Sequence, residues 1–354
     1  MSRKSALVIA ALAFGCAEPS RGGAPSASSA PRPAGSASAV RSVEAPLASS
    51  APPPGSAEAS APAGPRLLAL GVELTESYSM PRFTWRRWAK LSWQGDAASL
   101  PPLPTEPALD SGGCPAGMVR ARGALALDAS GRASTDGVAS YQNEACSFWR
   151  TRDHGEHGLC DRFEPERWRA KVETLPKQLV DFCIDRYEYP NAYGEFPLVV
   201  VTFSEAEAFC AKEEKRLCTE DEWTFACEGS EALPYPYGFE RDASACNIDV
   251  IAPGPTPGMF APRTTKATAR GIDLSWRGKR SGESPRCRSP LGVMDLTGNV
   301  DEWTLSSRKY GRRMILKGGH WGPARQRCRP ATRGHGPHYV RYDQGFRCCA
   351  DAPS

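Results

Sequence analysis

The chain has 354 residues, which is enough for one large domain or two ordinary domains with a substantial hydrophobic core. Its 44 basic and 40 acidic residues give a formal net charge of +4, and no dense stripe of lysine and arginine stands out. This balance excludes the strongly basic proteins that bind nucleic acids, and it predicts an ordinary, nearly neutral soluble surface.

Residues 1–16 have the pattern of a secretory signal, in which a short basic stretch precedes an apolar run from Ala6 to Phe14. The run is too short to span a membrane as a helix. Its ending at Gly15 and Cys16 resembles the lipobox of bacterial lipoproteins, where cleavage precedes a cysteine that is then acylated. The resemblance implies a lipid anchor on Cys16 that reaches a membrane, with plain signal cleavage as the alternative. Ala17 resembles a signal for sorting to the outer membrane, so we expect the protein to face the periplasm or the cell surface.

Residues 17–65 consist almost entirely of alanine, proline, serine and glycine. Such a segment buries too little apolar surface to offset chain entropy, so we expect a disordered tether. Residues 66–113 contain an apolar run, a patch with Trp85 and Trp88, and a proline-rich stretch. We interpret them as a strand or hairpin before the main domain. The two tryptophans are expected to pack on that domain, with carbohydrate stacking or contact with a membrane surface as the alternatives.

The main domain is expected to span residues 114–354 and to begin with a strand that follows Cys114. A stretch of mixed acidic and basic residues predicts a helix near Glu164–Thr174. Alternating apolar and polar residues then predict a half-buried strand over Phe182–Asn191, closed by a turn.

Two helices are marked by their capping residues. Ser204 with Glu207 has the spacing of a capping box, and so has Thr219 with Glu222. The charged residues 213–215 between these helices are interpreted as a solvated face. Proline and glycine are frequent after Gly229, which predicts a loop-rich remainder.

Twelve cysteines follow Cys16, and an even number in an exported chain predicts a framework of up to six disulfides. No two are separated by two residues as in a zinc knuckle, and the adjacent Cys348 and Cys349 could not readily share one tetrahedral metal. Disulfides are therefore favoured over zinc, and the spacing leaves their pairing open. The twelve lie at positions 114, 146, 160, 183, 210, 218, 227, 246, 287, 328, 348 and 349.

Four sequence blocks mark the C-terminal part of the chain: Arg216–Trp223, Gly292–Trp303, Lys317–Trp321 and Gly345–Cys348. In this order and at these separations they resemble the formylglycine-generating enzyme family, the sulfatase-modifying factor domain. Members of this family oxidise a sulfatase cysteine to formylglycine through a cysteine pair that holds copper. The resemblance is good over residues 182–351, about half of the chain.

The resemblance implies an α+β fold: a compact, loop-rich sulfatase-modifying-factor domain, related to the C-type-lectin fold and held by several disulfides. It also implies two of the pairings, Cys210 with Cys348 and Cys227 with Cys328.

The resemblance further implies structural calcium at a tight bend, since calcium prefers carboxylate and carbonyl oxygens. The matching positions in the first site are the side chains of Asp295 and Glu302 and the carbonyls of Gly298 and Val300. A second family site matches the carbonyl pair of Asn247 and Ile248. The alternative at the first position is a turn with a surface carboxylate.

The copper-binding pair is not recognisable. In the family the two cysteines lie four and nine residues after the glycine pair, and these positions are Pro323 and Cys328 here. A lone thiolate provides neither the two-sulfur site that copper(I) favours nor a redox pair, so the copper chemistry is predicted to be lost. The alternative is a metal-dependent oxidase of exported proteins, formylglycine-generating or related. Its candidate catalytic residues would be Cys328 or a copper or iron centre at His320, His335 and His338.

The C-terminal loops are instead rich in aromatic and guanidinium groups, which are frequent in binding hot spots. Arg329 and Arg347 have a structural alternative, pairing with carboxylates such as Glu222 or Glu302, and we favour it for Arg347. The sequence thus predicts an exported, lipid-anchored, non-catalytic module that binds a protein or glycan. The residues expected to contact this ligand are Trp321, Arg325, Arg327, Arg329, Arg333, His338, Tyr339, Arg341 and Tyr342.

Overall fold

The computed structural model describes residues 67–72, 88–93, 102–131, 135–151, 158–252, 274–307 and 313–354. All of them belong to one unit of the chain, Ala59–Ser354. The expected signal at 1–16, its Cys16, and the expected tether at 17–65 lie outside the described residues, as does Trp85. In the segment before the main domain, β1 (Leu67–Val72) pairs antiparallel with β2 (Trp88–Trp93).

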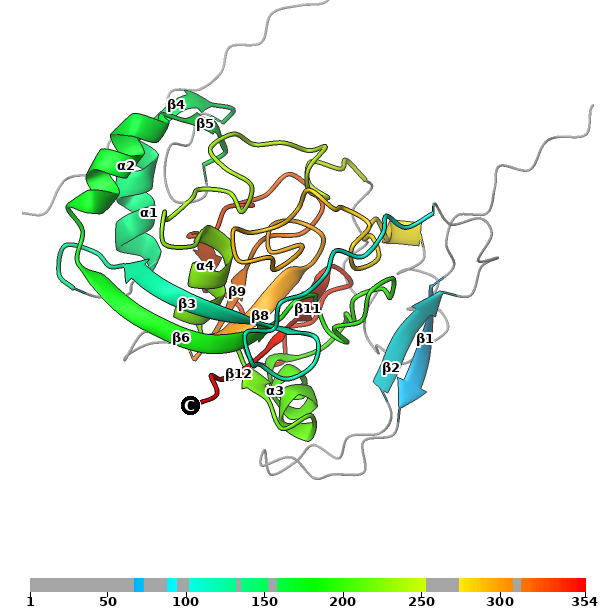
Figure 1. The fold of residues 1–354 in the computed structure, drawn as a ribbon. Coiled ribbons are helices and arrows are strands. Elements are labelled where there is room, and N and C mark those ends of the chain that lie inside the picture. The colour runs from blue at the N-terminus through cyan, green and yellow to red at the C-terminus, as the bar shows by residue number, and fades with distance from the viewer. Residues whose placement is uncertain are drawn as a thin grey trace, which may run out of the picture. The chain divides into compact units, whose positions relative to one another are not determined.

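One four-stranded sheet has the order β3-β6-β12-β7, formed by Met118–Ala126, Lys177–Asp185, Cys348–Asp351 and Arg216–Leu217. β3 and β6 pair along their whole length, from Met118 opposite Asp185 to Ala126 opposite Lys177. They form the long curved ribbon in Figure 1. The strand expected over 182–191 therefore begins earlier and ends at Asp185. The chain turns after it, and Asn191 takes a φ of 59°, which extended strands do not allow.

The second four-stranded sheet has the order β10-β9-β8-β11, formed by Ala331–Thr332, Met314–Lys317, Asp301–Leu305 and Gln344–Phe346. β8 pairs antiparallel with β9 and parallel with β11, so Gln344 lies opposite Asp301. A short hairpin, β4 (Cys146–Trp149) with β5 (Cys160–Phe163), lies apart from both sheets. The second sheet brings together three of the four sequence blocks.

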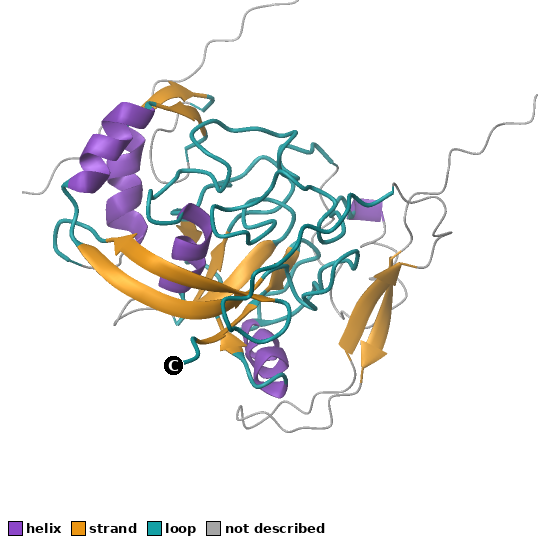
Figure 2. Ribbon diagram, viewed as in Figure 1, coloured by secondary structure: helices purple, strands orange, loops and turns teal. Residues whose placement is uncertain are grey.

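In the described residues four helices accompany the sheets: α1 (Thr135–Glu144), α2 (Pro165–Glu173), α3 (Phe203–Lys212) and α4 (Glu220–Glu228). α4 contacts β3 and β6 of one sheet and β8 and β9 of the other. Its buried side chains, which include Trp223 and Phe225, belong to the largest apolar cluster. Figure 2 shows that long loops make up much of the rest of the domain.

Both capping boxes can be compared with the structure. At α4 the prediction is confirmed, because Thr219 and Glu222 bond each other's backbone N–H groups. At α3 the prediction of Ser204 is wrong by two residues: the N-cap is Thr202, and its partner is Glu205. The solvated face expected at 213–215 is wrong for Lys215, whose Nζ lies 2.9 Å from the buried carboxylate of Asp185.

The cysteines of the described residues form six disulfides. Cys210 bonds Cys348, and Cys227 bonds Cys328, as the resemblance implied. A framework of this density is typical of chains that fold in an oxidising compartment. The other four pairs are Cys114–Cys183, Cys146–Cys160, Cys218–Cys349 and Cys246–Cys287.

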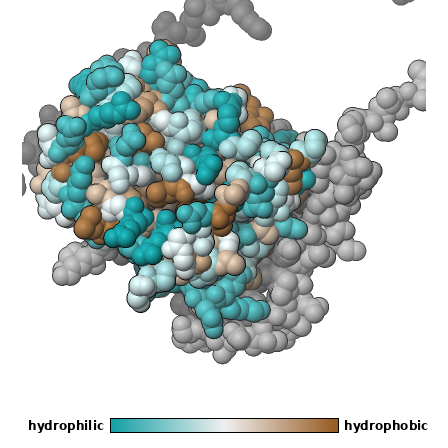
Figure 3. Space-filling model, in the orientation of Figure 1, coloured by the Kyte–Doolittle hydropathy of each residue, from teal (hydrophilic) through white to brown (hydrophobic). Residues whose placement is uncertain are grey.

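The surface shown in Figure 3 has polar and apolar residues interspersed over the visible face. Of the helices that the structure describes, none has the length and apolar composition needed to cross a bilayer.

Candidate functional site

The segment after β9 carries the glycine pair of the third sequence block and begins the loop of greatest interest. Gly318 and Gly319 have φ values of 88° and 74°, the left-handed region that favours glycine. A Cβ on Gly318 would lie 2.7 Å from the Leu296 carbonyl oxygen, so the turn also needs the absence of a side chain. The chain then folds back through Pro323 to Cys328 within a few residues.

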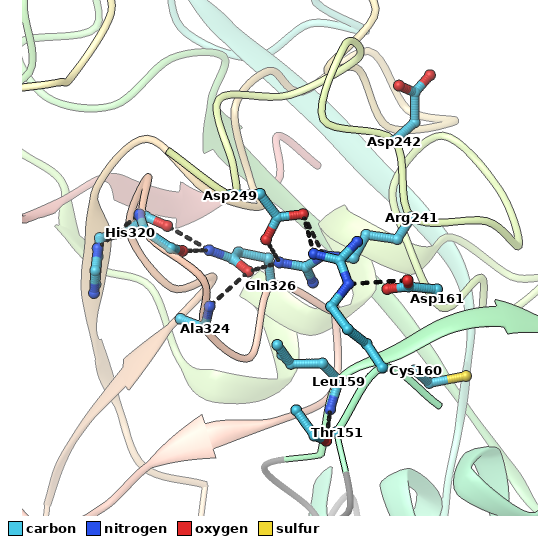
Figure 4. A network of polar contacts seen from close by, with 12 residues as sticks. Thr151, Leu159, Cys160, Asp161, Arg241, Asp242, Asp249, His320, Ala324 and Gln326 are labelled. Atoms are coloured by element: carbon cyan, nitrogen blue, oxygen red, sulfur yellow. Dashed lines mark hydrogen bonds and ion pairs between the residues drawn. The ribbon is translucent and has the colours of Figure 1, made fainter. Parts of the chain in front are cut away.

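A buried glutamine holds this loop closed (Figure 4). Nε2 of Gln326 donates to the carbonyl oxygens of His320, at 2.6 Å, and of Gly322, and its Oε1 accepts from the Ala324 N–H at 3.1 Å. Oε1 also accepts from Arg241. All the hydrogen-bonding capacity of the amide is used within the loop and its support, which makes the loop a fixed element.

The polar network that holds Gln326 through Arg241 extends further into the domain. Arg241 binds Asp249 through Nε at 2.9 Å and Nη2 at 2.7 Å, and Asp249 also accepts from Arg150 at 2.8 Å. Figure 4 shows this row of alternating charges beside Gln326. The neighbouring cations hold the pKa of Asp249 below its ordinary value, although burial opposes them. A carboxylate that stays ionised between two guanidinium groups fixes the loop by charge-assisted hydrogen bonds.

The loop does not hold a pair of thiols. Cys328 is fully buried and bonded to Cys227, and Pro323 occupies the other expected position. Each of the twelve cysteines in the part of the chain that the structure describes lies in a disulfide. Cys328, one of the candidate catalytic residues, is therefore not available as a nucleophile or a copper ligand in this oxidised state.

Beside the loop lies a cavity of about 300 Å³. It is open on one side and is lined by residues of β8, β9, β10 and β11 and of the segments that connect them. Two of the three candidate histidines, His320 and His335, line it, and His338 does not. The lining residues are Asp301, Leu316, His320, Ala324, Arg325, Thr332, His335, Tyr339, Arg341, Asp343 and Gln344.

Paired charges dominate the cavity wall. Nη2 of Arg325 donates to both carboxylate oxygens of Asp301, at 2.9 and 2.8 Å, and Nη2 of Arg341 donates to Asp343 at 2.7 Å. Burial raises the pKa of Asp343, while the Arg341 guanidinium opposes that effect. Each carboxylate thus has a guanidinium partner, and the wall is polar without an excess of either charge.

His320 takes part as a neutral group. Its Nδ1 accepts a hydrogen bond from the Gly322 N–H at 3.0 Å, which requires a lone pair on that nitrogen. Nδ1 also lies 3.7 Å from Asp343, but the bond from Gly322 leaves no proton there to share with the carboxylate. We therefore place the ring proton on Nε2.

The structure brings only part of the expected ligand-binding set to this cavity. Arg325, Tyr339 and Arg341 line it, whereas Trp321 and Tyr342 are buried in an apolar cluster with Trp276. The rings of Trp321 and Tyr342 are 5.4 Å apart. Side chains packed in this way stabilise the domain and do not face a ligand, so the prediction is wrong for both.

The remaining arginines of the expected ligand-binding set pair with other polar side chains of the domain. Arg329 is fully buried against Glu228, with Nε to Oε2 at 2.6 Å. Arg327 is 2% exposed and donates to Asn143 at 2.8 Å, and Arg333 pairs with Glu220. Loops with few backbone ladders need other partners for their polar groups, and buried arginines provide them. The assignment of Arg327 and Arg329 to a ligand surface is therefore wrong, whereas for Arg333, whose side chain is 20% exposed, it stays a prediction.

Sequence reasoning missed Asp301, Thr332, Asp343 and Gln344, which all line the cavity. For one of them, Asp301, the sequence contains a signal that could have identified it. Asp301 directly precedes Glu302, which is buried, and neighbouring strand residues point to opposite faces. An inward Glu302 therefore predicts that Asp301 lies on the other face of β8.

The expected calcium ligands form a different arrangement at Glu302. Both of its carboxylate oxygens accept from Arg347 at 2.7 Å, and one also accepts from the Trp223 indole at 2.9 Å. Glu302 does not fit a ligand role, because a guanidinium occupies its free directions. The pairing with Arg347 is the structural alternative favoured from the sequence.

The other calcium positions retain some donors. Oδ2 of Asp295 is buried without a hydrogen-bond partner among the described residues, and burial raises the pKa of this carboxyl to about 7. Gly298 lies against the Asn247–Ile248 segment, since a Cβ added to this glycine would be 2.4 Å from the Asn247 carbonyl oxygen. That oxygen already accepts from the Asn299 N–H at 2.9 Å. Calcium at the bend, with Val300 as a further carbonyl donor, stays a prediction.

A transition-metal centre has little support in the geometry. Within the described ranges, no three histidine, cysteine or acidic side chains lie together as metal ligands would. His335 instead stacks on Tyr339, with ring centroids 3.6 Å apart and planes 7° apart.

Comparison with known proteins agrees with the four sequence blocks. Residues 166–352 match the family described as sulfatase-modifying factor enzyme 1-like domain. The inactive C-alpha-formylglycine-generating enzyme 2 of Bos taurus is 33% identical over 167 residues, 45% of this chain and 51% of that protein. The formylglycine-generating enzyme of Mycobacterium tuberculosis is 28% identical over 188 residues, 45% of this chain and 58% of that protein.

Among solved structures, CarF aligns with a TM-score of 0.40 and 14% identity, over 67% of this chain and 98% of CarF. The chain spans about half the length of the curated relatives named above. Because the family match covers more than half of its residues, the chain belongs to the sulfatase-modifying factor enzyme 1-like domain family.

Proposed function

We propose that this chain is an exported, lipid-anchored protein whose domain has no copper oxidase activity and binds a protein or glycan at the cavity beside its C-terminal loops. One observation carries the proposal: Cys328 is bonded to Cys227 and Pro323 replaces the other expected cysteine. Without a thiolate pair, the loop has no soft two-sulfur site for copper(I).

The relatives support the loss of activity. The Bos taurus protein, which matches at 33% identity, is itself named as inactive. What remains at the corresponding place in this chain is a rigid, polar cavity of about 300 Å³, and concave sites of this kind are where small ligands and side chains bind.

Export and anchoring rest on other observations. Six disulfides in the described residues suit an oxidising compartment, and the N-terminal sequence that ends at Cys16 resembles a lipobox. Acylation of Cys16 would place the domain at the outer membrane, on a long Ala/Pro/Ser/Gly tether. Cys16→Ala should release the protein from the membrane fraction, and retention there would contradict the anchor.

The activity is tested with the full-length exported protein, copper(I), oxygen and a cysteine-containing sulfatase peptide. Mass spectrometry should show no aldehyde beyond that formed by copper alone. Aldehyde formation that depends on the protein would overturn the proposal and favour the oxidase.

The binding function is tested with the same protein immobilised and exposed to envelope polysaccharide and envelope protein fractions. Ala324→Trp fills the cavity from its rim, so it should abolish the binding seen with the natural chain. Binding that is equal in both proteins would show that the cavity is not the site.

A further inference from the structure

Two residues that line the cavity beside the 320–326 loop carry buried polar atoms that the described residues do not satisfy. Gln344 is 1% exposed, and neither its side-chain nitrogen nor its oxygen has a hydrogen-bond partner among the described residues. Nη1 of Arg325, which is 7% exposed, is also without a partner there. Leaving buried donors and acceptors unpaired is costly, so native structures rarely retain three in one place without a use.

The neighbouring Gln326 shows that the fold can satisfy a buried amide when the amide is structural. Its nitrogen and oxygen bond the backbone of His320, Gly322 and Ala324, and Arg241 completes the set. Gln344 makes no such bonds. Gln344 lines the cavity and Gln326 does not, and this difference indicates that the Gln344 amide is kept for an occupant.

The charges of the wall indicate an occupant without net charge. Asp301 is neutralised by Arg325, Asp343 is paired with Arg341, and His320 is neutral at Nδ1. A charged ligand would have to break one of these pairs and leave a partly buried charge without its partner, which is strongly unfavourable. A neutral ligand leaves both pairs intact.

The polar atoms without a hydrogen-bond partner limit which chemical groups the ligand can carry. Gln344 offers a donor and an acceptor, and Arg325 offers one more donor. Hydroxyl groups act as donor and acceptor at once, so adjacent hydroxyls can pair with an amide and a guanidinium together. The carboxylate oxygens of Asp301 and Asp343, which also line the cavity, can accept from further hydroxyls.

The rest of the wall suits a ring with an apolar face. The stacked rings of His335 and Tyr339, together with Leu316 and Ala324, supply flat and apolar surface. The cavity volume of about 300 Å³ is at the lower end for ligand sites. A cavity of this size holds one ring and not an extended chain.

We infer that the cavity binds one neutral sugar unit, as the end or a side branch of a glycan. The inference rests on the proposed binding function and makes it specific. The hydroxyls of the sugar pair with Gln344 and Arg325, and one face of its ring lies on the His335–Tyr339 stack.

The test measures binding of methyl glycosides of the common neutral hexoses, and of their N-acetylamino forms, to the full-length exported protein by calorimetry and saturation-transfer NMR. At least one should bind saturably, and the glycoside of glucuronic acid should not. Gln344→Met should weaken that binding by about tenfold or more, the size expected for losing one or two ligand hydrogen bonds.

The matched variant is Gln326→Met. Gln344→Met removes two unsatisfied polar atoms, so the free protein should melt at the same or a higher temperature. Gln326→Met removes a fully bonded amide and should melt lower. Loss of sugar binding with unchanged melting is the signature of a ligand role for Gln344, whereas a large drop in melting temperature of Gln344→Met would overturn it.

The sugar assignment and the proposed binding function can be contradicted by different results. If none of the neutral glycosides binds but Ala324→Trp still abolishes binding of envelope protein, the sugar assignment is wrong and the module binds protein. Preferred binding of the charged glycoside would also overturn it. If no binding depends on Ala324, both the sugar assignment and the proposed function fail.

Discussion

At the scale of single residues, this domain is held together by pairs of charged side chains that are buried and not solvated. Arg347 with Glu302 and Arg329 with Glu228 are four ionised groups with at most 1% exposure. Each pair connects a loop to the core of the domain. The high arginine content of the C-terminal part therefore reflects how loops are held, and among the described arginines only Arg325 and Arg341 also line the cavity.

Glu302→Gln should destabilise the domain by about 3–5 kcal/mol, because Arg347 is left as a buried charge without a full counter-charge. The free energy of unfolding is measured by urea denaturation of the oxidised protein. The control is Glu240→Gln, which breaks the exposed pair of Glu240 and Arg162, and should change the free energy by less than about 1 kcal/mol. Equal effects of the two substitutions would contradict a buried, structural role for Glu302.

Lys317 gives the domain a specific dependence on pH. It is fully buried, donates to the Cys328 and Arg329 carbonyl oxygens at 2.8 Å, and burial lowers its pKa to about 7. In the unfolded chain its pKa returns to about 10.5. Between these values the unfolded state binds the extra proton, so the contribution of Lys317 to the free energy of unfolding rises as pH increases from 7 to 10. Below pH 7 both states are protonated and this slope disappears.

The measurement is the free energy of unfolding from pH 6 to pH 10, for the natural chain and for Lys317→Met. The difference between the two proteins should grow in favour of the natural chain above pH 7. A difference that stays constant across this range would show that Lys317 titrates alike in both states.

At the scale of elements, α3 begins where the chain leaves a buried apolar run. Thr202 accepts from the Glu205 N–H at 3.2 Å, and the Glu205 carboxylate accepts from the Thr202 N–H at 2.6 Å. Ser204 lies inside the first turn. Thr202 with Glu205 and Ser204 with Glu207 are two overlapping capping-box patterns. The tertiary structure decides which of them forms the N-cap.

Thr202→Ala should therefore cost about 1 kcal/mol of unfolding free energy, the usual value for an N-cap, whereas Ser204→Ala should cost much less. Urea denaturation of the two variants under identical conditions decides between them. A larger loss for Ser204→Ala would restore the capping box expected from the sequence.

The bend from Asp295 to Val300 allows a direct test of calcium. Glu302 is committed to Arg347, so at most one carboxylate and a few carbonyl oxygens remain, and few charged ligands give weak sites. We expect the melting temperature to rise only at millimolar calcium, and the rise to be absent in Asp295→Asn. A rise at micromolar calcium would show that Glu302 leaves Arg347 to bind the ion.

The sequence was sufficient for some elements and not for others. The capping box at Thr219 and the pairs Cys210–Cys348 and Cys227–Cys328 follow from local patterns or from the family resemblance. The end of β6 at Asp185 does not, because the alternation of side chains continues into the turn. The cavity was found only in part, since Gln344 and Asp301 become neighbours through the parallel pairing of β11 with β8, which no local pattern specifies.

For the molecule as a whole, the disulfides take the place of extensive regular structure. They connect α3 and the end of β7 to β12, and α4 to the loop before β10. A loop-rich domain gains stability from such links because they restrict the unfolded chain. The same framework removes the thiols that the chemistry of the family requires.

Alkylation of the oxidised domain under denaturing conditions should therefore modify none of its twelve described cysteines, and alkylation after reduction should modify all of them. Intact-mass measurement counts the modified sites. Modification of Cys328 without prior reduction would reopen the case for a reactive thiol in the loop.

The order of the disulfide partners has a consequence for biogenesis. Of the six pairs, only Cys146–Cys160 and Cys246–Cys287 join cysteines that follow one another along the chain. The other links wait for later residues, and Cys210 and Cys218 find their partners only when Cys348 and Cys349 have arrived. A chain oxidised in the order in which its thiols emerge from a translocation channel would first acquire wrong bonds. We therefore expect maturation of this domain to require exchange of early disulfides, and the domain can close only after Cys348 and Cys349 have been synthesised.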